Sequence, residues 1–422
     1  NAIDYVPELK AAEQSDNPIL RDTIRYAKML EGNVRGTGVH ACGTIICRDD
    51  ITDWVPVSTA DDKETGEKML VTQYEGSVIE DTGLIKMDFL GLKTLSIIKE
   101  AVENIRLSRS LEIDVDQIDI NDPATYKLYS DGRTIGTFQF ESAGMQKYLK
   151  ELQPSKFEDL IAMNALYRPG PMESIPRFIA CKHDPKLVTY KHPRLVPILS
   201  VTYGCIVYQE QVIRIFQELG GFSLGQADMV RRAISKKKAK EIEKERQAFV
   251  YGDAERGIKG CIANGIDEKT AQAIYDEIYD FANYAFNKAH AVSYAVVAYQ
   301  TAYFKCHYTK EYMAALLTSV LDNSDKVAGY IGECRDCGIA LLPPDVNRSS
   351  DRFTVEPDGI RFGLVAIKNI GRGFIQSVVR EREQGGSFTS LQDFCDRMYD
   401  CGDMNKRAVE NLIRSGAFDS MG

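Results

Sequence analysis

A strand-like segment at residues 84–90, LIKMDFL, brings together two charged residues that could take part in phosphoryl-transfer chemistry. Its alternating pattern predicts that Leu84, Lys86 and Asp88 share one face, with the two charges about 7 Å apart along the strand. A carboxylate that holds Mg²⁺ beside a lysine that holds a phosphate is what phosphoryl transfer requires. The alternative is a cross-strand ion pair on a wetted surface. The opposite, apolar face carries Ile85, Met87 and Phe89.

A dense basic run occupies residues 231–240, where six residues are positive and none is acidic. Acidic residues alternate from Glu241 onward, so the excess of positive charge is local. Such a local excess is expected where a polyphosphate or a nucleic-acid backbone binds. A solvated helix face is the alternative interpretation. The six basic residues are Arg231, Arg232, Lys236, Lys237, Lys238 and Lys240.

A third candidate lies in the helical segment NYAFNKAHAVSYAVV. Helical spacing places His290 and Tyr294 on one side, with Asn287 and Lys288 one turn earlier. Hydrogen-bond donors beside a ring that can stack suit a triphosphate and a base, because aromatic faces bind bases regardless of sequence. The alternative is a histidine whose polar atoms are satisfied in a core.

Glycines mark a fourth candidate, AIKNIGRGF, in which two short helices are predicted on either side of a turn at residues 369–373. Glycine lets the backbone approach a phosphate oxygen, and a following helix N-terminus favours negative charge. Such a contact would position duplex DNA without reading its sequence. The alternative is a glycine C-cap and turn. The candidate residues are Lys368, Gly371, Arg372 and Gly373.

Composition limits the classes of protein to which the chain can belong. Its 422 residues have a net charge of −9, which excludes a uniformly basic nucleic-acid coat but not a local basic surface. Ten scattered cysteines fit reduced cytosolic thiols. Cys334 and Cys337 have a zinc-like spacing, but ordinary packing is favoured because Cys395 and Cys401 form no second tight pair. No membrane span or secretory signal is predicted, and the missing initiator Met indicates a segment of a larger protein.

The order of elements predicts an α+β fold that is predominantly α. Short strands are expected at residues 44–47, 69–74 and 84–90, after a helix at 16–30. Helical periodicity then dominates from residue 93 to about residue 320. A short β-like stretch follows at 339–365, and short helices alternate with glycine turns to the end.

With these residues in view, the chain resembles the alpha subunits of bacterial DNA polymerase III, the family C replicative polymerases. The resemblance extends from about residue 16 to residue 422. It rests on long motifs that occur in one order, among them GVHACGTII, KMDFLGLKTL, TFQFESAGMQKYL, ALYRPGPMES, MVRRAISKKK, NYAFNKAHAVSYA and GAFDS.

The resemblance implies transfer of deoxynucleotides from dNTP to a primer 3′-hydroxyl on template DNA, with two Mg²⁺ ions held by three aspartates. Asp88 would be the third of these, and Lys86 would neighbour the triphosphate. Arg231 and Arg232 would hold its phosphates, and Tyr294 would stack on the nascent base pair. Asn287, Lys288 and His290 would complete the helix that covers the nucleotide. The basic residues Lys236, Lys237 and Lys238, and a helix-hairpin-helix at residues 366–379, would bind DNA.

The resemblance also implies an architecture. Residues 1–38 would end the thumb, 39–92 would form the second part of a nucleotidyltransferase-like palm, 93–330 the helical fingers, and 331–422 a small β element with the helix-hairpin-helix region. The Pro-Asp-x-Asp motif that carries the family's other two aspartates is absent from these 422 residues. The isolated chain is therefore expected not to polymerise DNA. Contacts with the sliding clamp and other replisome subunits are expected outside this segment, in a cytoplasmic protein.

Three other classes stay open. A non-catalytic module that binds duplex DNA would use the hairpin and the basic helix without chemistry. A lesion-bypass relative of the replicase would share the same motifs. A helical scaffold would bind neither nucleotide nor DNA.

Overall fold

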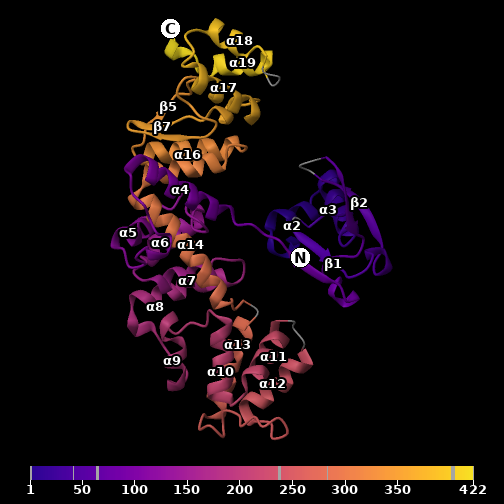
Figure 1. The fold of residues 1–422 in the computed structure, drawn as a ribbon. Helices are drawn as coiled ribbons and strands as arrows, with labels where there is room; N and C mark the ends of the chain where they lie inside the picture. The colour runs from indigo at the N-terminus through magenta and orange to yellow at the C-terminus, as the bar shows by residue number, and fades with distance from the viewer. Residues whose placement is uncertain are drawn as a thin grey trace. The chain divides into compact units, whose positions relative to one another are not determined.

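The chain forms two compact units, residues 1–91 and residues 92–422. The computed structural model describes residues 2–40, 42–62, 66–235, 239–282, 284–400 and 404–421 (Figure 1). Helices make up most of the second unit, and strands are short in both, which confirms the predicted α+β, predominantly α fold. The division at residue 91 is the only described boundary between units, so the four predicted domain ranges stay predictions.

The first unit contains a helical start and two small antiparallel sheets. β1 (Gly43–Ile46) pairs with β4 (Ile85–Asp88), and β2 (Val57–Asp61) pairs with β3 (Lys68–Thr72). The three strands expected from the sequence are therefore present as β1, β3 and β4, and β2 was not predicted. The helices are α1 (Ala2–Tyr5), α2 (Pro7–Glu13) and α3 (Pro18–Leu30).

Local sequence sets the start of α3. The side chain of Asn17 accepts a hydrogen bond from the backbone N–H of Ile19 at 3.0 Å, and Pro18 occupies the first helical position. Proline is favoured there because its missing N–H has no partner inside the helix. The helix predicted at residues 16–30 is thus confirmed as α3.

The core of the first unit is small. It consists of the buried side chains of Val55, Ile79 and Leu84, against which Ile45 and Ile51 pack. Neither α2 nor α3 contains a buried residue.

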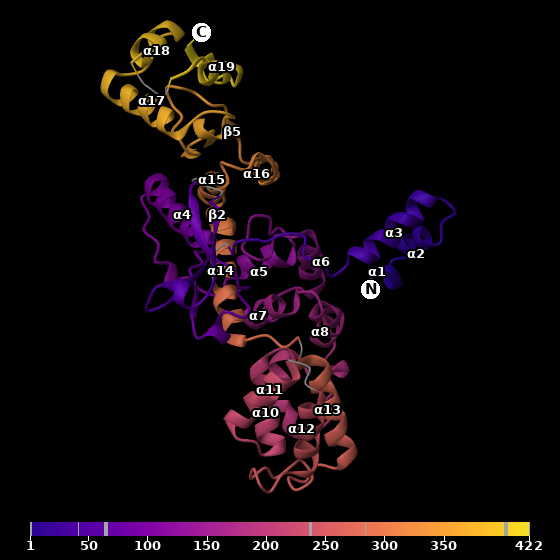
Figure 2. The same ribbon diagram turned by 90° about the vertical axis from the view of Figure 1, so that its right-hand side faces the viewer.

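A long central helix organises the second unit. α14 packs against α4, α5, α7 and α15 (Figures 1 and 2). Small side chains recur on its buried side at Ala291, Ala295, Ala298 and Ala302, which allows neighbouring helices to approach closely. The helices up to this point are α4 (Lys93–Arg109), α5 (Pro123–Ser130), α6 (Ala143–Leu152), α7 (Phe157–Leu166), α8 (Ile175–His183), α9 (Val196–Leu199), α10 (Gln209–Gly220), α11 (Leu224–Ser235), α12 (Ala239–Tyr251), α13 (Glu268–Ala282), α14 (Lys288–His307), α15 (Thr309–Ser319) and α16 (Ser324–Asp336).

The four helices α10–α13 pack around a core of their own (Figure 2). The rings of Phe216, Phe249 and Tyr275 meet in its centre, with centroids 5.0–6.1 Å apart. Arg231 and Arg232 of the basic run lie in α11 of this bundle, and the start of α14 follows the bundle in the chain.

The C-terminal part combines a small sheet with three helices. The strands β5 (Leu341–Leu342), β6 (Thr354–Glu356) and β7 (Gly359–Arg361) form a sheet of order β5-β7-β6, which confirms the predicted β-like stretch. The helices α17 (Arg372–Gly385), α18 (Leu391–Met398) and α19 (Lys406–Arg414) share one core. Short 3₁₀ turns lie at Ile51–Asp53, Glu80–Thr82, Val115–Gln117, Pro171–Ser174, Pro185–Leu187, Pro193–Leu195, Ser200–Thr202, Leu364–Ala366 and Asp419–Met421.

No helix in the described ranges has both the length and the apolar composition that crossing a membrane would require.

Candidate functional site

The two charged residues of β4 form an ion pair. The Lys86 Nζ donates to the Asp88 Oδ1 at 2.6 Å, and the Asp88 side chain is half exposed. The pair lies within one strand, so the cross-strand arrangement considered from the sequence is wrong. The hydrogen bond from Lys86 holds the pKa of Asp88 below its ordinary value, and desolvation opposes this shift. Asp88 therefore presents an ionised carboxylate at neutral pH.

The partner strand shapes this site through a glycine. Register places Gly43 of β1 opposite Asp88. A Cβ at this position would lie 2.9 Å from the His40 Nδ1, 3.0 Å from the Lys86 Cε and 3.1 Å from the Asp88 Oδ1. Glycine is thus what allows the three side chains to converge over β1.

A histidine and a cysteine lie beside this carboxylate. Ligand-type atoms of His40, Cys42 and Asp88 all lie within 4.8 Å of one another. The His40 Nδ1 already accepts the backbone N–H of Gly43 at 2.8 Å. Mg²⁺ prefers oxygen ligands, so only the Asp88 carboxylate of this group fits it. The first unit thus supplies one oxygen ligand of the kind that a magnesium site needs.

β4 is open to solvent on both faces, with Ile85, Met87 and Asp88 exposed and Lys86 intermediate. Leu84, on the same side as Lys86 and Asp88, is buried in the small core. The apolar Ile85 and Phe89 are 60% and 64% exposed. The strand was predicted correctly, but its sequence did not indicate that the apolar Ile85 and Phe89 would be exposed as well as Asp88.

The two arginines of α11 share one acid. Asp228, one turn earlier, pairs with the Arg231 Nη2 at 2.9 Å and with the Arg232 Nε at 2.8 Å. The basic run is therefore partly balanced from its N-terminal side. The Arg232 side chain is 68% exposed, whereas that of Arg231 is only 16% exposed. The predicted DNA contacts Lys236, Lys237 and Lys238 lie outside the described residues.

The start of α14 is fixed by two side-chain contacts. The Asn287 side chain accepts the backbone N–H of His290 at 2.8 Å, so this predicted nucleotide-binding residue acts as the helix cap. The Glu210 carboxylate, at the start of α10, accepts the backbone N–H of Lys288 at 3.0 Å. The Lys288 ammonium lies 5.5 Å from the centre of the Tyr208 ring. The contacts of Glu210 and Tyr208 were not foreseen, because they join residues far apart in the sequence.

Aromatic rings line the first turns of α14. His290 and Tyr294 stack with centroids 4.2 Å apart, which is the helical juxtaposition that the sequence predicted. His290 is exposed, and Tyr294 is half-buried. Phe286 meets His290 edge-on at 5.3 Å, and the Arg168 guanidinium lies 3.9 Å above Phe286.

Sequence reasoning did not assign Phe286 or Arg168. Phe286 could have been noticed as the aromatic residue directly before the cap, and Arg168 as the cation of the RPGP turn. The structure joins these two residues, His290 and Tyr294 into one row. β4 belongs to the first unit and these residues to the second, so a single site that contains both stays a prediction.

The glycine-rich turn leads directly into α17. Asn369 adopts a left-handed conformation with φ of 63°, and Gly371 precedes the helix without a side-chain cap. Of the two helices predicted around this turn, the second is present as α17, which begins at Arg372. The first is only a 3₁₀ turn at Leu364–Ala366. Arg372 and Gly373 thus lie in the first turn of α17. The side chain of Asn411 in α19 donates to the carbonyl of Lys368 at 3.0 Å and holds the turn from behind.

This turn presents hydrogen-bond donors to solvent. Lys368, Asn369, Gly371, Arg372 and Gly373 are all exposed. A helix N-terminus without a side-chain cap leaves backbone N–H groups directed outward, which is an arrangement that binds phosphate.

The cysteines favour packing over zinc. Cys334 is fully buried in an apolar core, and the Cys337 thiol donates to the Glu333 carboxylate at 3.6 Å. Burial raises the pKa of Cys334 to about 12, so this thiol stays protonated. Cys401 lies outside the described residues.

Family models match most of the chain. Residues 1–91 match the model of the bacterial DNA polymerase III alpha NTPase domain, and residues 94–257 match that of the bacterial DNA polymerase III alpha subunit finger domain. Residues 338–422 match a helix-hairpin-helix motif. These matches define the class as a subunit of a bacterial DNA polymerase.

Curated relatives define the family. The DNA polymerase III subunit alpha of Thermus aquaticus is 45% identical over 426 residues, which cover 100% of this chain and 34% of the relative. The subunits of Neisseria meningitidis serogroup B and Bacillus subtilis are 44% and 43% identical, covering 99% and 96% of this chain and 35% of each relative. The chain belongs to the family of bacterial DNA polymerase III alpha subunits. It spans about a third of the length of the curated relatives that it matches.

Proposed function

We propose that this chain is the part of a DNA-directed DNA polymerase that binds the incoming nucleotide and the product duplex. The observation that carries the proposal is identity of 45% along the whole chain to a DNA polymerase III alpha subunit. The motif containing Asp88 and the arginine pair of α11 fall within this match. The partners are primer–template DNA and deoxynucleoside triphosphates.

The proposed roles come from the family resemblance, and the geometry of each site supports them. The ionised Asp88, held by Lys86, is the candidate ligand of Mg²⁺, which when bound would neutralise charge on the transferring phosphate. The exposed Arg232 guanidinium is suited to bind oxygens of the triphosphate, since arginine binds phosphate through paired N–H groups. The rings of His290 and Tyr294 offer a stacking surface for a base.

Chemistry by the isolated 422-residue chain is not expected under this proposal. A two-metal site places its ions about 3.5–4 Å apart and needs several oxygen ligands. Among the described residues, those clustered with Asp88 are a histidine and a cysteine. The other two aspartates implied by the resemblance belong to the longer parent subunit.

Arg232→Ala is expected to raise the KM for dNTP in the longer parent subunit by about 10- to 100-fold, because a hydrogen bond to a charged group contributes about 1.5–3 kcal/mol. The measurement is steady-state insertion of one nucleotide at varied dNTP concentration. Arg214→Ala is the matched control, since Arg214 is an exposed arginine of the neighbouring α10 that pairs with Glu218 at 2.7 Å.

Equal values of KM for the wild type and Arg232→Ala would show that this arginine does not bind nucleotide. A parent subunit that binds duplex DNA but inserts no nucleotide would instead support the non-catalytic binding module.

Arg372→Gln is expected to weaken binding of duplex DNA by the 422-residue chain and to flatten its salt dependence. Each lost phosphate contact lowers the slope of log K against log salt by about 0.9. Fluorescence anisotropy with a labelled duplex at several salt concentrations measures this slope. Arg380→Gln, at an exposed position further along α17, is expected to leave it unchanged.

A glycine variant tests the same turn without changing charge. Gly371 has a φ of −78°, and a Cβ there would meet no atom within 4 Å, so Gly371→Ala should leave the fold intact. The added methyl group would obstruct an approaching phosphate, so duplex affinity should fall. Undiminished affinity in both variants would exclude the turn as a DNA contact.

A further inference from the structure

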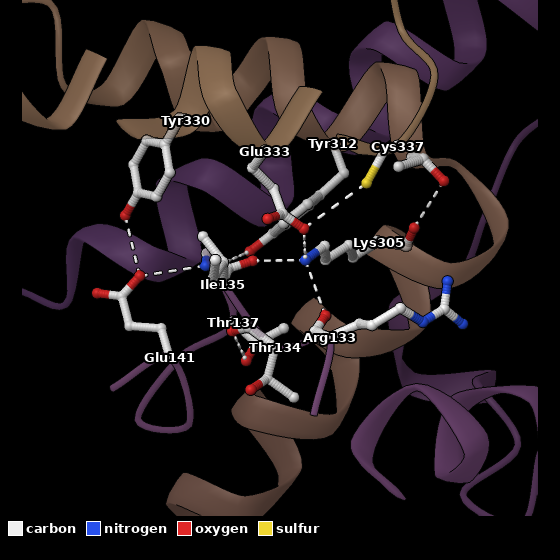
Figure 3. A network of polar contacts seen from close by, with 12 residues as sticks. Arg133, Thr134, Ile135, Thr137, Glu141, Lys305, Tyr312, Tyr330, Glu333 and Cys337 are labelled. Atoms are coloured by element: carbon white, nitrogen blue, oxygen red, sulfur yellow. Dashed lines mark hydrogen bonds and ion pairs between the residues drawn. The ribbon is translucent and has the colours of Figure 1, made fainter. Parts of the chain in front are cut away.

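The connection between α5 and α6 is an irregular segment, residues 131–142, that distant side chains hold in place. The buried Lys305 of α14 donates from its Nζ to the carbonyls of Arg133 and Ile135, each at 2.8 Å (Figure 3). The Tyr312 hydroxyl of α15 donates to the carbonyl of Gly136 at 2.7 Å. Three carbonyls within four residues of this segment are thus bound by side chains that follow them by at least 170 residues in the sequence.

Further contacts fix the same segment from α16 and from within. The Glu141 carboxylate accepts the backbone N–H of Gly136 and the hydroxyl of Tyr330, both at 3.1 Å (Figure 3). The Lys305 ammonium also donates to the Glu333 carboxylate at 2.6 Å. Gly136 has a φ of 78°, a left-handed conformation that favours glycine. The conformation of the segment is therefore set by several independent contacts.

This fixed segment presents one ring to α14. The backbone N–H of Phe138 donates to the hydroxyl of the buried Thr301 at 3.1 Å. The half-buried Phe138 ring packs against Tyr294 with centroids 5.2 Å apart. Tyr294 in turn stacks on the exposed His290 at 4.2 Å. Phe138, Tyr294 and His290 thus form a series of ring contacts that begins at the fixed backbone of residues 131–142 and ends at the exposed imidazole.

We infer that Phe138 is a positioning residue that holds the rings of Tyr294 and His290 in the orientation in which they receive the base of the incoming nucleotide. This inference rests on the proposed function of those two rings. Phe138 itself is not placed in contact with the nucleotide. Removing its ring frees Tyr294 to change rotamer, and the surface offered to a base is then no longer preorganised.

The first test measures the rings directly in the 422-residue chain. The chain has five histidines, so the imidazole signals can be resolved by NMR with labelled histidine and assigned by single His→Gln substitutions. Phe138→Leu is expected to shift and broaden the His290 signal. Phe157→Leu is the matched control, because the half-buried Phe157 packs on another α14 tyrosine, Tyr299, at 6.1 Å.

The second test measures nucleotide use in the longer parent subunit. Phe138→Leu is expected to raise the KM for dNTP by about 2- to 10-fold, the range of one aromatic pair contact, with a smaller effect on kcat. Phe138→Tyr should restore the wild-type KM, and Phe157→Leu should leave it unchanged. A purely structural role would instead give equal effects for Phe138→Leu and Phe157→Leu.

The outcomes separate this inference from the proposed function. An unshifted His290 signal in Phe138→Leu overturns the inference, as does a shifted signal with an unchanged KM in an active parent subunit. A wild-type parent subunit that inserts no nucleotide contradicts the proposed function itself, and the inference fails with it.

Discussion

Replacement of Asp88 by asparagine is expected to lower primer extension by the longer parent subunit by more than about 10²-fold, because charge stabilisation by a bound metal contributes several kcal/mol. Asparagine keeps the size of the side chain but removes the negative charge that a divalent cation requires. The variant is therefore expected to keep its fold but to extend primers more slowly and with an altered dependence on Mg²⁺. Initial rates of extension at several Mg²⁺ concentrations measure it.

A matched control for this variant exists in the same unit. Asp53 is an exposed aspartate in the 3₁₀ turn at Ile51–Asp53, so Asp53→Asn removes one carboxylate away from β4. It should extend primers at the wild-type rate. If the parent subunit works equally well with asparagine at position 88, the assignment of Asp88 as a metal ligand is wrong, although membership of the family stands.

Lys305→Met is expected to destabilise the second unit by about 3–5 kcal/mol, because removal of one partner leaves a buried charge without compensation. The Lys305 and Glu333 side chains are only 2% and 8% exposed. The variant also leaves the carbonyls of Arg133 and Ile135 without their donor. Hydrogen exchange in peptides that cover residues 131–142 and 325–337 measures the loss locally.

Two further variants test whether the buried charge causes the loss of stability expected for Lys305→Met. Lys127→Met removes an exposed lysine that pairs with Asp131 at 3.0 Å, and it should cost less than about 1 kcal/mol. Combining Lys305→Met with Glu333→Met should recover part of the stability, because an apolar pair carries no buried charge. Exchange protection in Lys305→Met equal to that of the wild type would contradict the described network.

Local patterns predicted the elements well where neighbours in sequence decide them. Asn17 caps α3 and Asp122 caps α5, each directly before a proline at the first helical position, which is a local pattern. The contact between the rings of His290 and Tyr294 was indicated by their i, i+4 spacing. The pairing of Arg231 and Arg232 with Asp228 has the same local origin, and a window that began at Asp228 would have revealed it.

Contacts between distant residues could not be predicted in this way. An alternating strand defines two faces but does not say which is covered, so the exposure of Ile85 and Phe89 could not be predicted. Glu210 reaches the N-terminus of α14 across 78 residues of sequence. Phe138 reaches Tyr294 only because the segment before α6 folds against α14 and α15. Asn287, predicted for its chemistry, also serves the backbone as the cap of α14.

The central claim is that the chain supplies the nucleotide- and duplex-binding parts of a polymerase whose chemistry needs the longer subunit. Gel-resolved primer extension with Mg²⁺ and all four deoxynucleotides tests it most directly, with the 422-residue chain and the longer parent subunit side by side. The account predicts extended primers with the parent subunit and none with the 422-residue chain. Extension by the 422-residue chain, or its absence from both proteins, would contradict the account.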